Sequence, residues 1–177
     1  MATGIMEVLL VNAKGLGDTD FLSIELLRFF CVGHMDPYIV IQYKGQEHKS
    51  SVARGQGGSP VWNEKFSFRA EYPGSGDNYK IILKIFDKDT FSSDDFLGQA
   101  TIYVEDLLVL GAEKGTADMH SLKYSVVDKD KAYRGEMQVG VTFTLKVKEE
   151  SGHKFGGWKE SNFSLCRSCS ERNKVLF

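Results

Sequence analysis

The chain has 177 residues, of which 42% are hydrophobic, enough to bury the core of one globular domain of ordinary size. Its 22 basic and 24 acidic residues give a net charge of -2, and the basic residues are scattered, so the composition indicates no nucleic-acid partner. Three cysteines make no disulfide framework, no basic and apolar leader opens the sequence, and no apolar run approaches the roughly 18 residues of a membrane span. These features predict a cytoplasmic protein.

Short runs in which apolar and polar residues alternate dominate the first 148 positions, and such runs are typical of half-buried strands. The predicted strands are 5–12, 38–43, 48–52, 65–69, 79–86, 100–104, 121–126 and 137–148. Between them, residues 105–111 predict one short helical turn closed by Gly111. Eight short strands joined by loops predict an all-β fold, an eight-stranded antiparallel β-sandwich.

The alternating pattern stops near position 148, so residues 1–148 are predicted to form the domain. Residues 149–177 form a polar tail that carries Gly and Ser, and we expect it to be disordered. Cys166 and Cys169 resemble half of a zinc site, but no second pair is present, and we assign them no metal.

Five aspartates fall into two loop-like clusters beside predicted strands: Asp20 and Asp36, then Asp87, Asp89 and Asp95. Carboxylates held about 4 Å apart repel by roughly 4 kcal/mol per pair at surface-like screening, and a divalent cation relieves that repulsion. Ca²⁺ accepts six to eight oxygens in irregular geometry, whereas zinc prefers nitrogen and sulfur. A single aspartate more often closes a turn or faces water, so the prediction depends on both clusters. The spacing after Asp87 does not fit an EF-hand, so the ligands would converge from separate loops.

Several segments, in order, resemble the C2 domain family. Residues 6–16 look like its first strand, Asp36-Pro37-Tyr38 like its Asp-Pro-Tyr strand start, 59–68 like its Pro-x-Trp-Asn-Glu-x-Phe-x-Phe segment, and 86–98 like its third calcium loop with the exit strand. The resemblance covers about residues 4–147 and extends to small single-domain plant proteins of the elicitor-responsive and phloem type. Residues 135–139 resemble a strand that some members carry first, which implies the second, circularly permuted topology.

The resemblance implies calcium ligands at Asp20 and Asp36 in loop one and at Asp87, Asp89 and Asp95 in loop three, with Asp89 as the bridging carboxylate. Ser92 matches a position that assists a second ion. Asp18 and Asp94 match no ligand position, and we expect them to be solvated neighbours.

One departure from the family concerns loop one, because its two aspartates usually stand about six positions apart and here stand sixteen apart. The inserted stretch, about 23–34, is strongly apolar for a loop. On one interpretation it lengthens a hydrophobic prong that enters a bilayer, with Leu22 and Phe91 as membrane contacts. On the other it is an unpacked segment that weakens the calcium site.

By resemblance we expect calcium-dependent binding of anionic phospholipid membranes by a single C2 domain, with movement from the cytoplasm to the plasma membrane when calcium rises, in calcium signalling or plant defence. The alternative is a calcium-independent module that binds proteins or phosphoinositides through a basic strand face of Lys44, His48, Lys49 and Arg54. Residues 85–90 also look like the opening of haloacid-dehalogenase-type phosphatases, but the sequence after residue 90 lacks the alternating strands and helices of that fold. No enzyme activity is expected.

Overall fold

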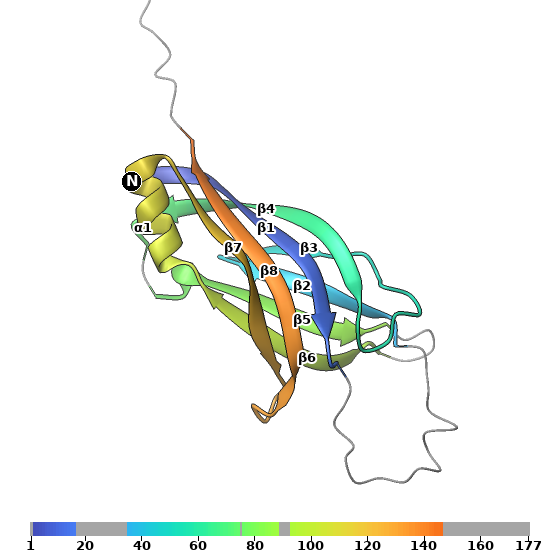
Figure 1. Cartoon of the computed structure of the whole chain (residues 1–177). Helices are drawn as coiled ribbons and strands as arrows, with labels where there is room; N and C mark the ends of the chain where they lie inside the picture. Colours follow the sequence, from blue (N-terminus) through green and yellow to red (C-terminus); the bar gives the residue numbers. More distant parts are fainter. Residues whose placement is uncertain (1, 17–34, 75, 89–92, 147–177) are drawn as a thin grey trace, which may run out of the picture. The chain divides into compact units, whose positions relative to one another are not determined.

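Eight antiparallel strands and one α-helix make up the part of the chain that the computed structural model describes, residues 2–16, 35–74, 76–88 and 93–146 (Figure 1). The strands are β1 (Ala2–Lys14), β2 (Pro37–Tyr43), β3 (Gln46–Lys49), β4 (Val61–Tyr72), β5 (Lys80–Asp87), β6 (Asp95–Tyr103), β7 (Thr116–Val127) and β8 (Tyr133–Leu145). A 3₁₀ turn, η2 (Gly76–Tyr79), precedes β5, and α1 (Glu105–Lys114) lies between β6 and β7.

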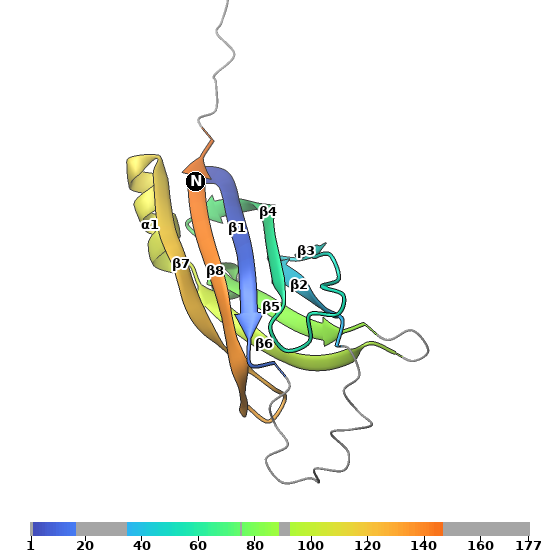
Figure 2. The ribbon, with the colours of Figure 1, turned by 45° about the vertical axis from the view of Figure 1, so that its right-hand side comes forward.

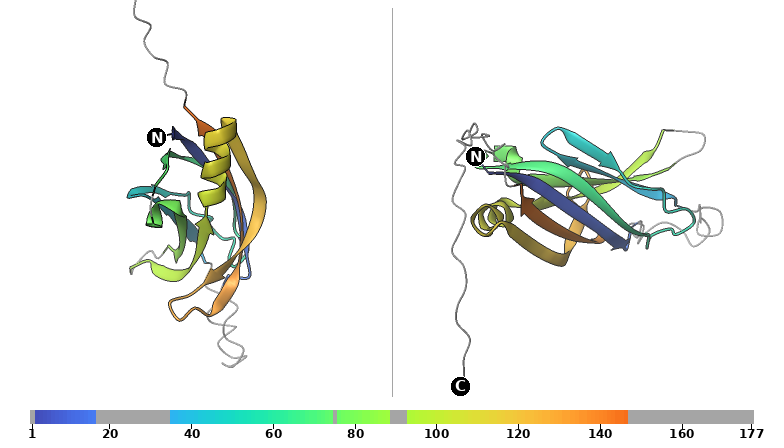
Figure 3. Two further views of the ribbon diagram at one scale, coloured as in Figure 1. Left: turned by 90° about the vertical axis from the view of Figure 1, so that its left-hand side faces the viewer. Right: turned by 90° about the horizontal axis from the view of Figure 1, so that it is seen from above.

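The strands follow the order β3-β2-β5-β6-β7-β8-β1-β4. The strands β3-β2-β5-β6 form one half of this order and β7-β8-β1-β4 form the other. The two halves are joined at a single residue pair of β6 and β7, Gln99 with Val127. They lie as two layers of a nearly closed sandwich (Figures 2 and 3). The predicted eight-stranded antiparallel sandwich is confirmed, whereas its circular permutation stays a prediction.

Alternation of side chains along the strands builds one core between the layers. In β8, Met137, Val139 and Phe143 are fully buried, and from the other layer Ile81 and Leu83 of β5 meet them in the same cluster. The intervening residues of β5 are only partly buried, and they line the outer face of its layer. The period-two patterns of the sequence therefore correspond to the inner faces of the two layers.

Several predicted boundaries differ from the structure, and two of the differences have a clear local cause. Strand β3 begins at Gln46 instead of 48, because Lys44 and Gly45 adopt φ values of 48° and 73° and close a two-residue turn after β2. Helix α1 continues through Gly111 to Lys114 and ends at Gly115, whose φ is 85°. Gly111 serves the packing, since a Cβ there would lie 2.2 Å from Cδ1 of Phe143.

The phosphatase interpretation is contradicted by the strand that comes after Asp87. Strand β5 ends at Asp87 and is followed by β6, which pairs with it antiparallel, whereas a phosphatase of that type needs a parallel sheet with alternating helices. Across the described ranges, no helix has the length and apolarity that a membrane crossing requires. The predicted insertion at 23–34 and the predicted tail at 149–177 lie outside these ranges.

Candidate metal site at one end of the sandwich

Three of the five predicted ligands lie at the ends of neighbouring strands, at one end of the sandwich. Asp36 precedes β2, Asp87 ends β5, and Asp95 begins β6. Pro37 is paired with Asp87, and Asp87 is paired with Asp95. The fold therefore brings residues from two distant parts of the sequence into one row.

Backbone hydrogen bonds hold two of these carboxylates in place. The N–H of Asp36 donates to Oδ1 of Asp87 at 2.8 Å, and the N–H of Gly55 donates to Oδ1 of Asp36 at 2.7 Å. The N–H of Lys88 donates to the carbonyl of Asp36 at 3.1 Å. These three bonds order the start of β2 against the end of β5, and two of them fix a carboxylate oxygen.

The donor set fits calcium in kind, because it consists of carboxylate oxygens held on loop and strand ends. Within the described ranges, however, no group of three or more His, Cys, Asp or Glu side chains is arranged to hold a metal ion. Asp20 and Asp89 lie outside these ranges, as do Asp18, Leu22, Phe91 and Ser92. The complete ligand set therefore stays a prediction.

Asp94 also lies at this end, and the expectation that it is a solvated neighbour is wrong. Its side chain is 20% exposed, Oδ1 accepts from the ammonium of Lys88 at 2.8 Å, and Oδ2 accepts from the hydroxyl of Tyr38 at 2.6 Å. Tyr38 and Asp94 are 56 positions apart, so only the register of the strands brings them together.

Tyr38 belongs to an aromatic cluster beside the three aspartates, in which Phe86 contacts both Tyr38 and Phe96. The Tyr38 ring stacks on Phe86 with centroids 5.6 Å apart, and Nζ of Lys49 lies 3.6 Å from the Tyr38 centroid. Burial, followed by the hydrogen bond to Asp94 and its charge, raises the pKa of Tyr38 to about 12. The Tyr38 hydroxyl therefore stays a hydrogen-bond donor across the physiological range.

A further loop, residues 50–60, lies against the same end. Three backbone hydrogen bonds tie this loop to β2 and to the segments that flank it: Ala53 N–H to Pro37 O, Gly57 N–H to Met35 O, and Leu16 N–H to Gly58 O. Arg54 is exposed on this loop, next to the Gly55 N–H that binds Asp36. A basic residue therefore directly precedes the backbone donor that binds Asp36.

The predicted basic strand face of Lys44, His48, Lys49 and Arg54 is not one surface. The His48 ring contacts the rings of Phe66 and Phe68, whereas Lys49 lies over Tyr38 and Arg54 lies in the loop. Lys44 lies in the β2–β3 turn. Its ammonium donates to the carbonyl of Glu71 at 3.5 Å.

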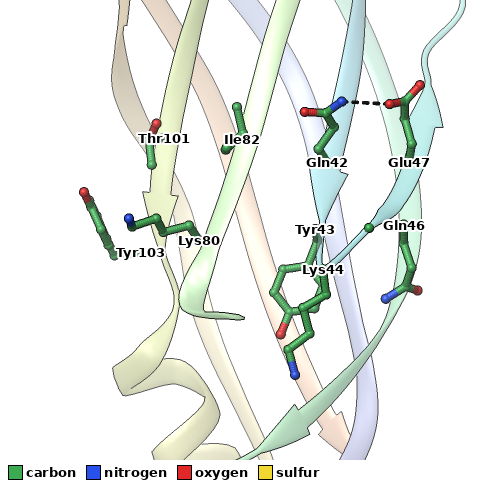
Figure 4. Close-up of a pocket in the computed structure, with 10 residues that line it drawn as sticks. Gln42, Tyr43, Lys44, Gln46, Glu47, Lys80, Ile82, Thr101 and Tyr103 are labelled. Carbon is green, nitrogen blue, oxygen red and sulfur yellow. Dashed lines mark hydrogen bonds between the residues drawn. The ribbon is translucent and has the colours of Figure 1, made fainter. Parts of the chain in front are cut away.

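The outer face of β2, β3, β5 and β6 does carry lysines, and two of them, Lys44 and Lys49, belong to the predicted set. Lys49 and Lys84 are the two strand partners of Val40. Lys44 and Lys80 line a hollow of about 580 Å³ on this face, together with Tyr103 and the hydrogen-bonded pair Gln42 and Glu47 (Figure 4). This face is the second candidate for a binding surface.

The fold and the row of strand-end aspartates define a class of protein, and comparison with known families agrees. The C2 domain model matches residues 4–119, and the chain belongs to the C2 domain family. Membership supports membrane or lipid binding at the level of the family.

Particular relatives cover nearly the whole chain. It is 51% identical over 163 residues to 16 kDa phloem protein 1 of Arabidopsis thaliana, across 91% of this chain and 98% of the relative. It is 48% identical over 160 residues to Elicitor-responsive protein 1 of Oryza sativa subsp. japonica, across 90% and 96%. A solved structure of a C2 domain-containing protein from an elicitor-responsive gene superposes with a TM-score of 0.62 at 36% identity, covering 85% of this chain and 96% of that one. The resemblance to small plant C2 proteins is confirmed.

Proposed function

We propose that this chain is a calcium-dependent phospholipid-binding module that acts through the end carrying Asp36, Asp87 and Asp95. The observation that carries the proposal is the row of these residues on neighbouring strands, with the Asp36 N–H bound to the Asp87 carboxylate at 2.8 Å. In the proposal Asp20 and Asp89 supply the remaining carboxylates from the two adjoining segments, and Asp89 bridges.

Charge provides the switch. Carboxylates gathered at one end repel an anionic lipid surface, and a bound calcium ion cancels that charge and offers coordination positions to lipid phosphates. The protein preorganises part of the site, because the backbone N–H groups of Gly55 and Asp36 hold the carboxylates of Asp36 and Asp87 in place before an ion binds. Leu22 and Phe91, on the two adjoining segments, are the proposed apolar contacts with the bilayer.

Location and process belong to the same proposal. A module of this kind would move from the cytoplasm to the plasma membrane when calcium rises. The name of the rice relative, Elicitor-responsive protein 1, supports a place in defence signalling. Vesicle sedimentation distinguishes the two interpretations of the insertion at 23–34. Calcium-driven sedimentation of the wild type favours a longer apolar prong, and its absence favours a weakened calcium site.

The test is sedimentation with phosphatidylserine-containing vesicles in calcium or in chelator. Replacing Asp87 and Asp89 by Asn abolishes calcium-driven sedimentation if the proposal holds, since two of five carboxylates lose their charge. The matched control changes Asp106 to Asn and Glu113 to Gln in α1, which removes the same charge from exposed positions elsewhere. Unchanged sedimentation of the Asp87 and Asp89 variant would refute the site.

A second candidate function is calcium-independent binding of phosphoinositides or proteins, and the lysine-lined hollow supports it. Lys44 reaches this hollow from the β2–β3 turn and Lys80 reaches it from β5, beside Tyr103. Binding that is insensitive to chelator and is lost when Lys44 and Lys80 become Gln would favour this function over the calcium switch. Glu47 in the same hollow opposes an anionic ligand, which makes this the weaker candidate.

A further inference from the structure

The hairpin between β7 and β8 lies at the same end of the sandwich as the three aspartates (Figures 1 and 2). On one side its base adjoins the end of β1, where Glu136 pairs with Lys14. On the other side Nζ of Lys129 lies 5.7 Å from the ring centroid of Phe96, the residue that comes after Asp95. The hairpin therefore stands between the end of β1 and the start of β6.

Asp128 organises the tip of this hairpin. Its Oδ1 accepts the backbone N–H groups of Asp130 at 2.8 Å and Ala132 at 2.9 Å, and its Oδ2 accepts Nε of Arg134 at 2.9 Å. These bonds, led by the one from Ala132, lower the pKa of the Asp128 carboxyl. The Asp128 side chain is only 13% exposed. Its carboxylate binds groups of the turn itself, and these bonds fix the conformation of the tip.

The tip carries two exposed lysines and an exposed aromatic residue. Lys129 and Lys131 are exposed, and Tyr133 leaves 62% of its surface uncovered. Asp130 is the one exposed acid among residues 128–134. Lysines near an anionic lipid surface are attracted to its phosphates, and tyrosine rings favour the boundary between water and lipid.

We propose that this hairpin tip is a second contact with the anionic bilayer, in which Lys129 and Lys131 meet lipid phosphates and Tyr133 lies at the interface. The inference rests on the proposed function, because that function turns the end with the three aspartates toward the membrane. The hairpin contact itself needs no calcium ion. Because the tip carries positive groups beside the acidic strand ends, it supplies attraction to lipid before calcium neutralises the carboxylates. It also selects the orientation in which those strand ends approach the membrane.

The experiment measures partitioning of the full chain onto phosphatidylcholine vesicles with and without phosphatidylserine, in calcium and in chelator. The hairpin variant carries Lys129→Gln and Lys131→Gln. Its control carries Lys65→Gln and Lys114→Gln, which remove the same charge from exposed positions on β4 and α1. A third variant, Asp130→Asn, changes the charge of the tip in the opposite direction.

Each lysine near the surface is worth about a fivefold change in partitioning, so the hairpin variant should bind phosphatidylserine vesicles about 25-fold more weakly than the wild type. The control should stay close to the wild type, and Asp130→Asn should bind more tightly. Calcium affinity measured without lipid should not change in the hairpin variant.

Equal losses in the hairpin variant and in the control, or no loss in the hairpin variant, would overturn the inference. If calcium has no effect on the wild type but the hairpin variant still binds more weakly than the control, the calcium switch fails and the hairpin contact stands. A wild type that binds phosphatidylserine vesicles in neither condition would overturn both.

Discussion

Replacing Tyr38 by Phe tests the hydrogen bond between Tyr38 of β2 and Asp94, which lies just before β6. The Tyr38 hydroxyl, on a residue only 6% exposed, donates to Oδ2 of Asp94 at 2.6 Å. A hydrogen bond to a charged group is worth about 1.5 to 3 kcal/mol. Asp94 retains the Lys88 ammonium at 2.8 Å in the variant, so we expect a loss near the lower limit, about 1.5 kcal/mol at neutral pH.

The pH dependence of this loss separates the hydrogen bond from simple packing. The pKa of Tyr38 is raised from 10.0 to about 12, so the stabilisation is complete below pH 10 and is lost as the pH rises toward 12. A pKa shift of that size limits the contribution of the neutral Tyr38 hydroxyl to the free energy of unfolding to about 2.7 kcal/mol. The loss of about 1.5 kcal/mol expected from the hydrogen bond lies within this limit. The difference in stability between wild type and variant should therefore be constant in the neutral range and shrink above pH 10.

Urea unfolding followed by circular dichroism at a series of pH values measures this difference. Tyr103→Phe is the control, because Tyr103 is 66% exposed and should cost little. Equal stabilities of wild type and Tyr38→Phe at neutral pH would refute the contact. A difference that does not shrink above pH 10 would refute the account of its pKa.

Three further predictions concern packing, the hairpin and the site. Gly111→Ala should destabilise the fold, because overpacking against Phe143 costs about 1 to 3 kcal/mol and outweighs a gain in helix propensity of about 1 kcal/mol; a higher melting temperature would contradict the packing. Asp128→Ala should lower the melting temperature at neutral pH and approach the wild type in strong acid, where the carboxyl of lowered pKa is protonated and its contribution is lost; a gap that persists in strong acid would contradict it. Asp36→Asn should weaken calcium binding measured by calorimetry more than Asp106→Asn does, and equal effects would remove Asp36 from the site.

The class of fold could be predicted because most strands carry one apolar face. The pattern from 137 onward places Met137, Val139 and Phe143 on one side, and all three are buried. The sequence predicts strand β7 only from 121 because Thr116–Val127 is largely exposed, and without burial the alternating pattern carries little signal. The predicted start of β3 is shifted because this strand is polar and its start is set by the turn at Lys44 and Gly45.

The candidate site could be predicted only in part. Asp36, Asp87 and Asp95 share a row because each directly adjoins a strand end, a property that is visible in the sequence. The role of Asp94 was not visible, because it depends on the register that places its carboxylate against Tyr38. The predicted basic strand face could have been rejected from the sequence, because adjacent strand residues point to opposite faces: Lys49 lies over Tyr38, whereas the ring of its neighbour His48 meets Phe66.

The most direct measurement of the calcium switch is a calorimetric Ca²⁺ titration of the purified chain, repeated with phosphatidylserine vesicles. The proposal predicts binding on the order of 10⁻⁷ to 10⁻⁵ M without lipid, which tightens when vesicles are present because the two ligands favour each other's binding. The absence of calcium-binding heat in both conditions would contradict it and leave the calcium-independent module as the function to pursue.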